Sequence, residues 1–426
     1  MLPPGPRLPA LVQTAWFLTN PARAFERCHE KYGPIFTLRY LGFPPEVYVT
    51  TGELAEQVYQ LDQGGGRAGQ ARRDFLEPLV GAHSVLTLDG ESWQRHRRLV
   101  TPPLRAKQVA GYRDEIASIA ADRIATWPLG TPFTLRERMQ EITMEVILRL
   151  VFGIRDAARL DRLRALVPQL MEVASSPSVA MTPPSLRKVM ERVPFLPNAR
   201  FVRLRASVDE ILFDEIARRR AEPGGTDVLG RLLETELADQ EVRDELITML
   251  VAGHETTATG LSWAFERLLR DREMLDRLPD DEDYLDAVVK EVLRVRPVVY
   301  EAPRVLDAPL RLGGYEIPAG WYVGPVIPLV HHDPSAFPEP AEFRPERFLD
   351  GQQSRSWMPF GGGRRFCVGA QLALLEMRVI IREVLHRLEL TAPDPAPEAR
   401  RLKNVTFAPA KRTRVIARVR TPARTP

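Results

Sequence analysis

The chain has 426 residues, of which 44% are hydrophobic and 27% charged, ordinary proportions for a globular protein with an apolar core. A formal net charge of +3 is close to balance and gives no sign of a nucleic-acid-binding protein. Two cysteines, Cys28 and Cys367, exclude a disulfide framework and fit a reducing compartment. No stretch reaches the roughly 18 apolar residues of a membrane-spanning helix, and no signal peptide is visible. We therefore expect a cytoplasmic protein without a membrane anchor.

The first ninety residues predict loops around one short β-hairpin. Its strands would be residues 35–40 and 46–50, which are rich in β-branched and aromatic residues and are separated by Gly42 and two prolines. Residues 62–92 contain several glycines and are predicted as a loop.

Beyond residue 90 the spacing of apolar residues becomes mainly helical. Helices are predicted near residues 109–126, 136–153, 158–174, 199–220, 239–270, 283–294 and 369–388. A Ser- and Pro-rich loop is predicted at 175–198, and short strands at 310–328 and 404–419. The expected fold is mainly α with a small β-rich side, a single domain over residues 1–426 with a flexible tail at 420–426.

The strongest chemical signal is the segment Phe-Gly-Gly-Gly-Arg-Arg-Phe-Cys-Val-Gly at residues 360–369. Its glycines permit positive φ angles and close approach of the backbone to a flat ligand. A helix predicted from Gly369 or Ala370 would place Cys367 at a helix N-terminus, where free N–H groups favour the thiolate. A cysteine without such context is more often a buried core residue, which is our interpretation of Cys28. For the pattern F-x-x-G-x-R-x-C-x-G, a chance match in this length is on the order of 1 in 10,000.

This segment resembles the haem-binding signature of the cytochrome P-450 family. The resemblance implies haem b, iron protoporphyrin IX, with Cys367 as the iron ligand and Arg365 paired with a haem propionate. Phe360 and Gly369 belong to the same cofactor-binding segment. The implied fold holds the haem between a long central helix and the cysteine-bearing loop.

A second signal lies in the middle of the long helix predicted at residues 239–270, which would span roughly 45 Å. Residues 252–257 read Ala-Gly-His-Glu-Thr-Thr. A glycine beside two threonines is poor helix material, and threonine hydroxyls can bond preceding carbonyls, so a local opening or kink is expected. By itself the stretch is also compatible with a polar surface turn, although its flanks are apolar.

The family resemblance gives roles to this segment. Ala252 and Gly253 match the groove in which oxygen is activated, and Glu255 and Thr256 match the acid–alcohol pair that relays protons. His254 differs from Thr256 in helical phase, so we interpret it as structural.

An E-x-x-R motif supports the same family. The bare pattern also fits Glu215/Arg218, Glu301/Arg304 and Glu398/Arg401, but Glu291/Arg294 lies at a helix end before Pro297, upstream of the cysteine. The resemblance implies a buried ion pair of Glu291 with Arg294, completed by Arg347, that braces the haem-side core.

Three further residues match haem-propionate positions of the family. Trp93 and Arg97 are four residues apart and share a helix face, so both could reach one propionate. An amphipathic surface helix is the open alternative for this pair. Arg304 matches another propionate-binding arginine.

The implied function is a monooxygenase that inserts one oxygen atom of O₂ into a hydrophobic substrate such as a terpenoid, steroid, fatty acid or polyketide. The substrate pocket would include Met249, Val298, Val299 and Phe407. Electrons would come from a separate ferredoxin and ferredoxin reductase, or an equivalent system. Arg95, Arg98 and Arg364 either steer this partner to the protein or are ordinary solvated charges. A haem-thiolate isomerase or peroxygenase, whose members tend to lose the acid–alcohol pair, and a non-catalytic haem sensor remain the alternatives.

Overall fold

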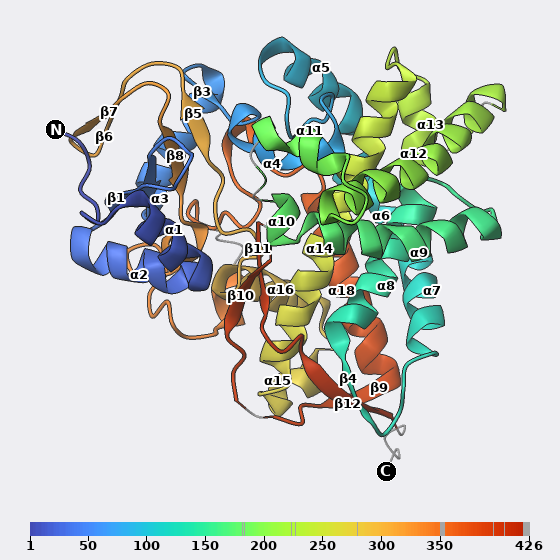
Figure 1. The fold of residues 1–426 in the computed structure, drawn as a ribbon. Coiled ribbons are helices and arrows are strands. Elements are labelled where there is room, and N and C mark those ends of the chain that lie inside the picture. Colours follow the sequence, from blue (N-terminus) through green and yellow to red (C-terminus); the bar gives the residue numbers. More distant parts are fainter. Residues whose placement is uncertain are drawn as a thin grey trace. The chain divides into compact units, whose positions relative to one another are not determined.

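The computed structural model describes residues 1–426 apart from 181, 183, 223, 226, 279, 350–353, 395, 404 and 421–426. The chain forms two compact units. The first contains residues 1–71, 113–140 and 256–426, and the second contains residues 72–112 and 141–255. The mainly helical fold with small sheets is the predicted one (Figure 1).

A five-stranded sheet organises the N-terminal part of the first unit. Its strand order is β1 (Ile35–Leu38), β2 (Glu46–Val49), β8 (Tyr322–Pro325), β5 (Arg304–Leu306) and β3 (Gly66–Arg67). The β1–β2 pair is antiparallel, with Ile35 opposite Val49, as the predicted hairpin requires. Strand β8 joins β2 in parallel.

The two faces of this sheet carry different cores because side chains alternate along a strand. Ile35, Val47 and Val49 pack with residues of α3 (Gly52–Gln60). Their neighbours Phe36 and Tyr48 pack instead with aromatic side chains that include Phe25 of α2 (Pro21–Tyr32). All four residues of each strand are buried, so the sheet is covered on both faces here.

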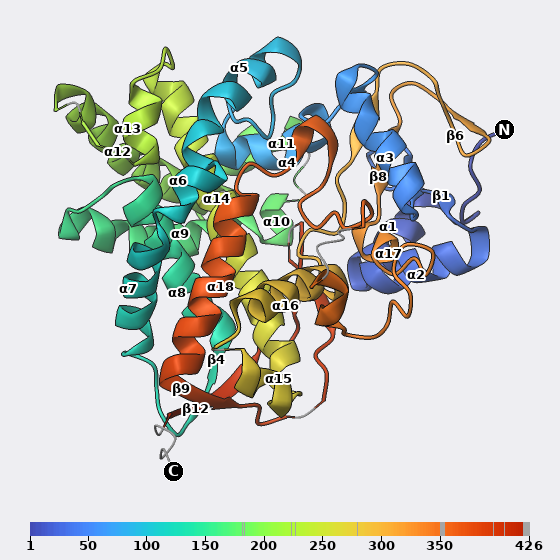
Figure 2. The ribbon, with the colours of Figure 1, turned by 180° about the vertical axis from the view of Figure 1, so that it is seen from behind.

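The helical part of the first unit surrounds α18 (Ala370–Arg387), the helix that follows the cysteine segment. Figure 2 shows α7 (Arg113–Ile124) and α16 (Glu282–Val295) beside it. The long helix α14 (Asp239–Leu268) contributes residues 256–268 to this unit and 239–255 to the other. A Cβ on Gly260 of α14 would lie 3.2 Å from Met377 Sδ of α18, so glycine permits close contact of the two helices.

The other elements of the first unit are short. They are α1 (Ala10–Thr19), η1 (Leu61–Gln63), α15 (Arg272–Arg277), β6 (Leu310–Leu312), β7 (Tyr315–Ile317), α17 (Ile327–Val330), η4 (Pro345–Phe348), η5 (Gly363–Arg365), β10 (Arg400–Lys403), β11 (Thr406–Pro409), and the sheet of β4 (Pro132–Thr134), β12 (Arg414–Val419) and β9 (Leu388–Thr391).

The second unit is helical. Its elements are α4 (Gln70–Val80, beginning in the first unit), α5 (Gly90–Val100), η2 (Pro102–Leu104), α6 (Ala106–Ala110), α8 (Leu135–Val146, shared with the first unit), a π-helical turn η3 (Ile147–Val151), α9 (Ala157–Ala174), α10 (Pro177–Ala180), α11 (Pro184–Glu191), α12 (Pro197–Ala221) and α13 (Val228–Leu233). Helices α9 and α12 pack side by side, joined by an ion pair of 2.7 Å between Arg159 and Glu215. Helix α14 begins here.

Several loop predictions were wrong. Residues 62–92 contain α4, whose internal Pro78 suggested a loop. Proline lacks the N–H that would bond the carbonyl of Asp74, and that oxygen accepts instead from Arg187 Nη2 at 3.0 Å. Residues 175–198 contain α10 and α11, and each begins at a proline, a residue that suits the first helical position as well as a loop.

Near the termini the predictions were also incomplete. Helices α1, α2 and α3 lie in the segment expected to consist of loops and one hairpin. Arg420, expected to open a flexible tail, is anchored: its backbone N–H donates to Arg387 O at 2.9 Å, at the end of α18. The remainder of that predicted tail, residues 421–426, lies outside the described residues.

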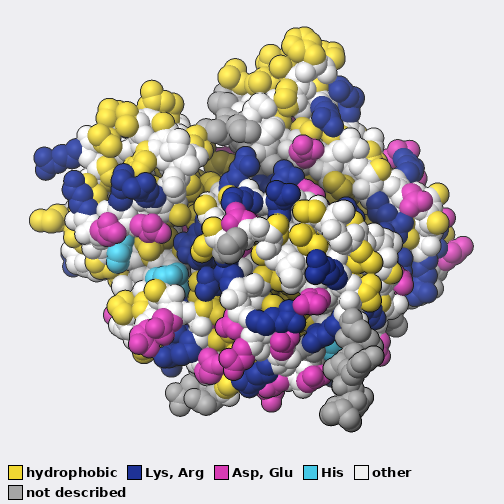
Figure 3. Space-filling view, turned by 90° about the horizontal axis from the view of Figure 1, so that it is seen from below, with side chains coloured by type: hydrophobic (Ala, Val, Ile, Leu, Met, Phe, Trp, Pro, Cys, Tyr) yellow, Lys and Arg dark blue, Asp and Glu magenta, His cyan; other side chains and the backbone are white. Residues whose placement is uncertain are grey.

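The face drawn in Figure 3 carries charged and hydrophobic side chains. On the face drawn in Figure 3, basic and acidic side chains are interspersed, as the net charge of +3 suggests. None of the helices in the described part of the chain has both the length and the hydropathy that crossing a membrane requires.

Candidate active site

The cysteine segment forms a tight loop before α18. Gly361 and Gly363 adopt φ angles of 72° and 63°, a region that residues with a Cβ seldom enter. The Cys367 N–H donates to Phe360 O at 3.0 Å, which closes the loop. Cys367 is exposed and lies two residues before Gly369, the N-cap of α18, so the predicted position near a helix N-terminus is the observed one.

The glycines of this loop also serve packing within the first unit. A Cβ on Gly363 would lie 2.7 Å from Tyr59 O, and one on Gly362 would clash with the Tyr59 ring. We expected the glycines to let the backbone approach a flat ligand. At Gly362 and Gly363 the backbone instead lies close to α3.

Asp62 joins the loop to Arg304. Its carboxylate accepts from Arg304 Nε at 2.7 Å and Nη2 at 2.9 Å, and Oδ2 accepts from the Arg365 N–H at 3.3 Å. Arg304 Nη1 donates to two carbonyls, those of Ala302 and Pro303. Four hydrogen bonds thus use four of the five N–H groups of Arg304, which leaves at most one for the predicted propionate contact.

The E-x-x-R motif forms a fully buried ion pair. Arg294 donates to Glu291 from Nε and Nη2, both at 2.7 Å, and Arg347 Nε lies 3.2 Å from Glu291 Oε1. The remaining Arg294 donors bind the carbonyls of His331, Pro340 and Glu342. This group of three charges therefore fixes the irregular segment 331–348 against α16.

His331 extends this arrangement towards the cysteine. Its Nδ1 lies 3.0 Å from Arg294 O, and its Nε2 accepts from the Met358 N–H at 2.9 Å. Met358 O in turn accepts from the Gly361 N–H at 3.0 Å. A continuous path of hydrogen bonds thus connects the ion pair with the loop that holds Cys367.

Helix α14 carries the second part of the predicted site. Between residues 242 and 265 it is buried except at Met249, Val251, Ala252, Gly253 and Thr256. Apart from Val251, these residues have the spacing i, i+3, i+4, i+7 of one helix face. The two residues at the centre of this accessible stripe, Ala252 and Gly253, have the smallest side chains.

The expected opening of α14 is not visible as an interruption, since the helix is continuous through residues 252–257. Gly253 has a packing reason: a Cβ there would lie 2.9 Å from Ile147 Cδ1 in the π-helical turn η3. Glu255 and His254 are buried, whereas Thr256 belongs to the accessible stripe. Thr143 Oγ1 donates to the backbone carbonyl of His254 at 3.0 Å, and the structural role of the His254 side chain stays a prediction.

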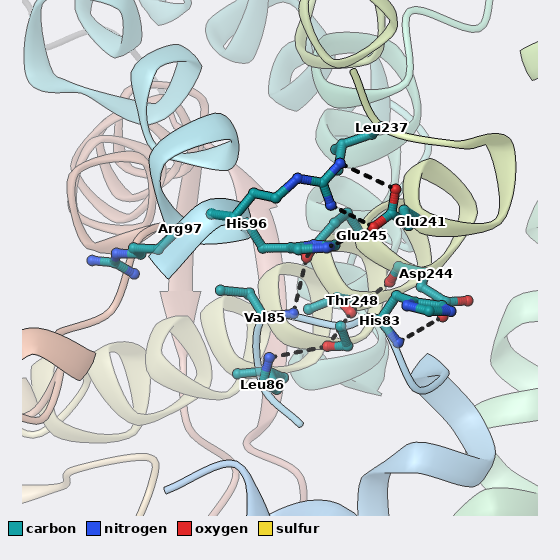
Figure 4. A network of polar contacts seen from close by, with 12 residues as sticks. His83, Val85, Leu86, His96, Arg97, Leu237, Glu241, Asp244, Glu245 and Thr248 are labelled. Atoms are coloured by element: carbon teal, nitrogen blue, oxygen red, sulfur yellow. Dashed lines mark hydrogen bonds and ion pairs between the residues drawn. The ribbon is translucent and has the colours of Figure 1, made fainter. Parts of the chain in front are cut away.

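Trp93 and Arg97 lie on α5 in the second unit. Trp93 is buried and Arg97 is partly exposed. Figure 4 shows that the Arg97 side chain extends away from His96, which points to α14. Arg95, expected among the partner-steering cations, is committed to Glu241 at 2.6 Å and Glu236 at 3.0 Å, whereas Arg98 and Arg364 are exposed.

The predicted pocket residues of the first unit are brought together. The Phe407 N–H donates to Val298 O at 2.8 Å, and Val299 pairs with Thr406. The Phe407 ring is buried against Tyr300, 5.2 Å away, within the aromatic cluster of the sheet, so its place in the pocket stays a prediction. Val299 remains partly exposed. Met249 lies on the accessible stripe of α14.

Comparison with known proteins decides the family. The family model described as cytochrome P450 matches residues 2–416. The chain belongs to the cytochrome P450 family. It is 40% identical to cytochrome P450 135B1 of Mycobacterium tuberculosis, over 98% of this chain and 91% of that protein. Cytochrome P450 138 of the same organism is 35% identical over 98% of this chain and 97% of that one.

Solved structures show the same fold. Retinoic acid-bound cyanobacterial CYP120A1 superimposes with a TM-score of 0.83 at 23% identity, covering 98% of this chain and 99% of that one. The cytochrome P450DA heme domain gives 0.83 at 22% identity, covering 99% and 98%. The family match and the two relatives identify a haem-dependent cytochrome P450 monooxygenase, as the cysteine motif predicted.

Some participants were not predicted. Asp62 and His331 contact motif residues that lie far away in sequence, and no motif of their own marks them. His96 gave a weak signal, a histidine one helical turn after Trp93, and its partners Glu241 and Glu245 form part of the acidic start of α14.

Proposed function

We propose that this P450 inserts one oxygen atom of O₂ into a hydrophobic organic substrate, with haem b as cofactor and a ferredoxin with its reductase as electron source. The observation that carries the proposal is the exposed Cys367 thiol on a fixed loop directly before α18. Bound haem would supply the activation of O₂, which a thiolate ligand favours by promoting O–O cleavage.

The loop suits a thiolate ligand for two physical reasons. The first N–H groups of α18 have no partners within the helix, and the helix dipole is positive at that end. Both effects lower the cost of a negative sulfur at Cys367. Arg365, two residues earlier, would pair with a propionate, and Arg304 would add at most one N–H to it.

Thr256 and Glu255 would deliver protons to the site of oxygen activation. The Thr256 hydroxyl lies on the accessible stripe of α14, where it can hold a water molecule next to the substrate. Glu255 is buried, and we assign its carboxyl the role of passing protons to that hydroxyl by acid–base exchange. Retention of this pair supports a monooxygenase over an isomerase or peroxygenase.

The substrate class follows from the apolar character of the accessible candidates. Met249 and Val299 are the partly exposed members of the predicted pocket set, and neither can anchor a charged group. A library of terpenoids, steroids, fatty acids and polyketides, screened for a shift of the haem Soret band, would identify the class.

The central assignment is tested by the reduced carbon monoxide complex. Wild-type protein should show the red-shifted Soret band of thiolate ligation, and Cys367→Ala should lose it. Cys28→Ala is the matched control, because Cys28 is buried in the aromatic core and should leave the band unchanged. Retention of the band in Cys367→Ala would contradict the proposal.

A further inference from the structure

His96 of α5 is buried between two carboxylates of α14 (Figure 4). Its Nδ1 lies 2.8 Å from Glu245 Oε1, and its Nε2 lies 3.2 Å from Glu241 Oε1. A neutral imidazole has one N–H and can donate to only one of these oxygens, so its other nitrogen would face an acceptor with a lone pair. The two contacts are satisfied together by the imidazolium, which donates from both nitrogens.

The charges around His96 support this protonation. Burial raises the pKa of Glu241, but hydrogen bonds from Arg95, the Ala238 N–H and His96 lower it to about 2. Burial lowers the pKa of His96, yet Glu245 and Glu241 outweigh burial and leave it raised above 6.5. Burial raises the pKa of Glu245, and the hydrogen bond and charge of His96 offset part of that rise.

The other charged groups nearby are already paired. Asp244 receives Arg243 Nη1 at 2.9 Å and Gln240 Nε2 at 2.8 Å, and Glu236 binds Arg95. His83, on the loop before α5, has an exposed side chain and contributes its backbone N–H to Asp244. His96 and Glu245 are therefore the titratable groups at the centre of the network.

A single carboxylate oxygen of α14 binds both α5 and the loop that precedes it. Glu245 Oε1 accepts from His96 and also from the Val85 N–H at 2.9 Å. Thr248 Oγ1, one turn further along α14, donates to Ser84 Oγ at 2.6 Å. Helix α5 and the loop before it are thus fixed to the same turns of α14.

This arrangement controls residues beyond His96. Helix α5 has 11 residues, so Trp93 and Arg97 move with any displacement of the turn that carries His96. Figure 4 shows Arg97 directed away from the carboxylates. The contacts of His96 therefore orient the helix, and the Arg97 side chain extends to a different side of it.

We propose that protonated His96 is a positioning residue that sets Trp93 and Arg97 for a haem propionate, an inference that rests on the function proposed above. Because the folded state favours the charged ring, the tether is complete below pH 6.5 and is lost as the pH rises through the pKa of His96 in the folded protein. Haem should then leave the protein faster in alkaline solution.

The experiment measures transfer of haem from the purified holoenzyme to an excess of a haem-free acceptor protein between pH 6 and 10. In the wild type the rate should rise about tenfold or more across this range, since the charge-assisted hydrogen bonds of the imidazolium are lost. His96→Gln should release haem rapidly at pH 6 and show little further rise. His96→Lys, which keeps a positive charge, should restore part of the slow release.

His83→Asn is the matched control and should follow the wild type. Circular dichroism must show that each variant is folded. If His96→Gln does not fold, Glu241→Gln, at a partly exposed position, removes one of the two carboxylates that raise the pKa of His96, so the rise in haem release should begin at a lower pH than in the wild type. Equal rates for His96→Gln and His83→Asn at every pH, or a wild-type rate independent of pH, would overturn the inference. A wild-type holoenzyme without the thiolate Soret band would instead overturn the haem assignment, and this inference with it.

Discussion

Arg294 and His331 hold each other by reciprocal hydrogen bonds. Arg294 Nη1 donates to His331 O at 2.9 Å, and His331 Nδ1 donates to Arg294 O at 3.0 Å. The Met358 N–H donates to Nε2, so the ring must be neutral, with its proton on Nδ1. The neutral ring thus connects α16, through Arg294, to Met358 in the loop before Cys367.

This neutrality predicts sensitivity to acid. Burial lowers the pKa of His331 to about 3, whereas an unfolded histidine titrates near 6.5. Between these values the unfolded state binds the extra proton, so the free energy of unfolding should fall as the pH falls from about 6.5 to 3. Urea denaturation of wild type and His331→Gln between pH 7 and 4 should show a shallower pH dependence in the variant. Parallel curves would contradict a neutral buried His331.

The Glu291–Arg294 ion pair should be costly to break from one side. Arg294→Ala leaves Glu291 buried and removes donors from three carbonyls, so we expect a loss of about 3–5 kcal/mol in the free energy of unfolding. Arg277→Ala breaks the exposed pair with Asp281, which solvent screens, so the free energy of unfolding should change far less than in Arg294→Ala. Denaturant unfolding of both variants makes the comparison. Equal effects would show that burial does not strengthen the pair.

Thr256 should control how efficiently electrons reach product. Thr256→Ala removes the hydroxyl from the accessible stripe while changing little volume, so haem content and substrate binding should persist. NADPH should still be consumed, with more hydrogen peroxide and much less product per NADPH. Thr256→Ser keeps the hydroxyl and should retain most of the wild-type ratio. An unchanged ratio in Thr256→Ala would remove the proton-relay assignment.

Electron supply should require a partner. Holoenzyme with NADPH and O₂ alone should be inactive, and a ferredoxin with its reductase should start turnover. Arg98→Glu and Arg364→Glu should raise the KM for ferredoxin, because both side chains are exposed cations, and the effect should weaken as salt rises. NADPH oxidation by the holoenzyme alone would contradict the need for a partner. Unaltered KM values would mean that the two arginines are ordinary solvated charges.

The sequence predicted those parts of the site that local patterns encode. The Cys367 loop, the start of α18 and the Glu291–Arg294 pair depend on residues a few positions apart, and the structure has all three. The bond between Asp62 and Arg304 joins positions 242 residues apart, and no local pattern predicts it. His96 and Glu245 are likewise 149 residues apart. Burial of Phe407 depends on aromatic side chains from α2 and the sheet, which residue spacing cannot reveal.

The segment 331–348 has only the short η4 as helix, yet a buried guanidinium binds its carbonyls at three places. Proteases prefer exposed stretches whose backbone can leave the surface and enter their clefts. Here the backbone cannot leave unless Arg294 loses its acceptors and α16 is disturbed. Trypsin should therefore spare Arg347 in the native protein, so an irregular stretch of chain would have the protease resistance of a core helix.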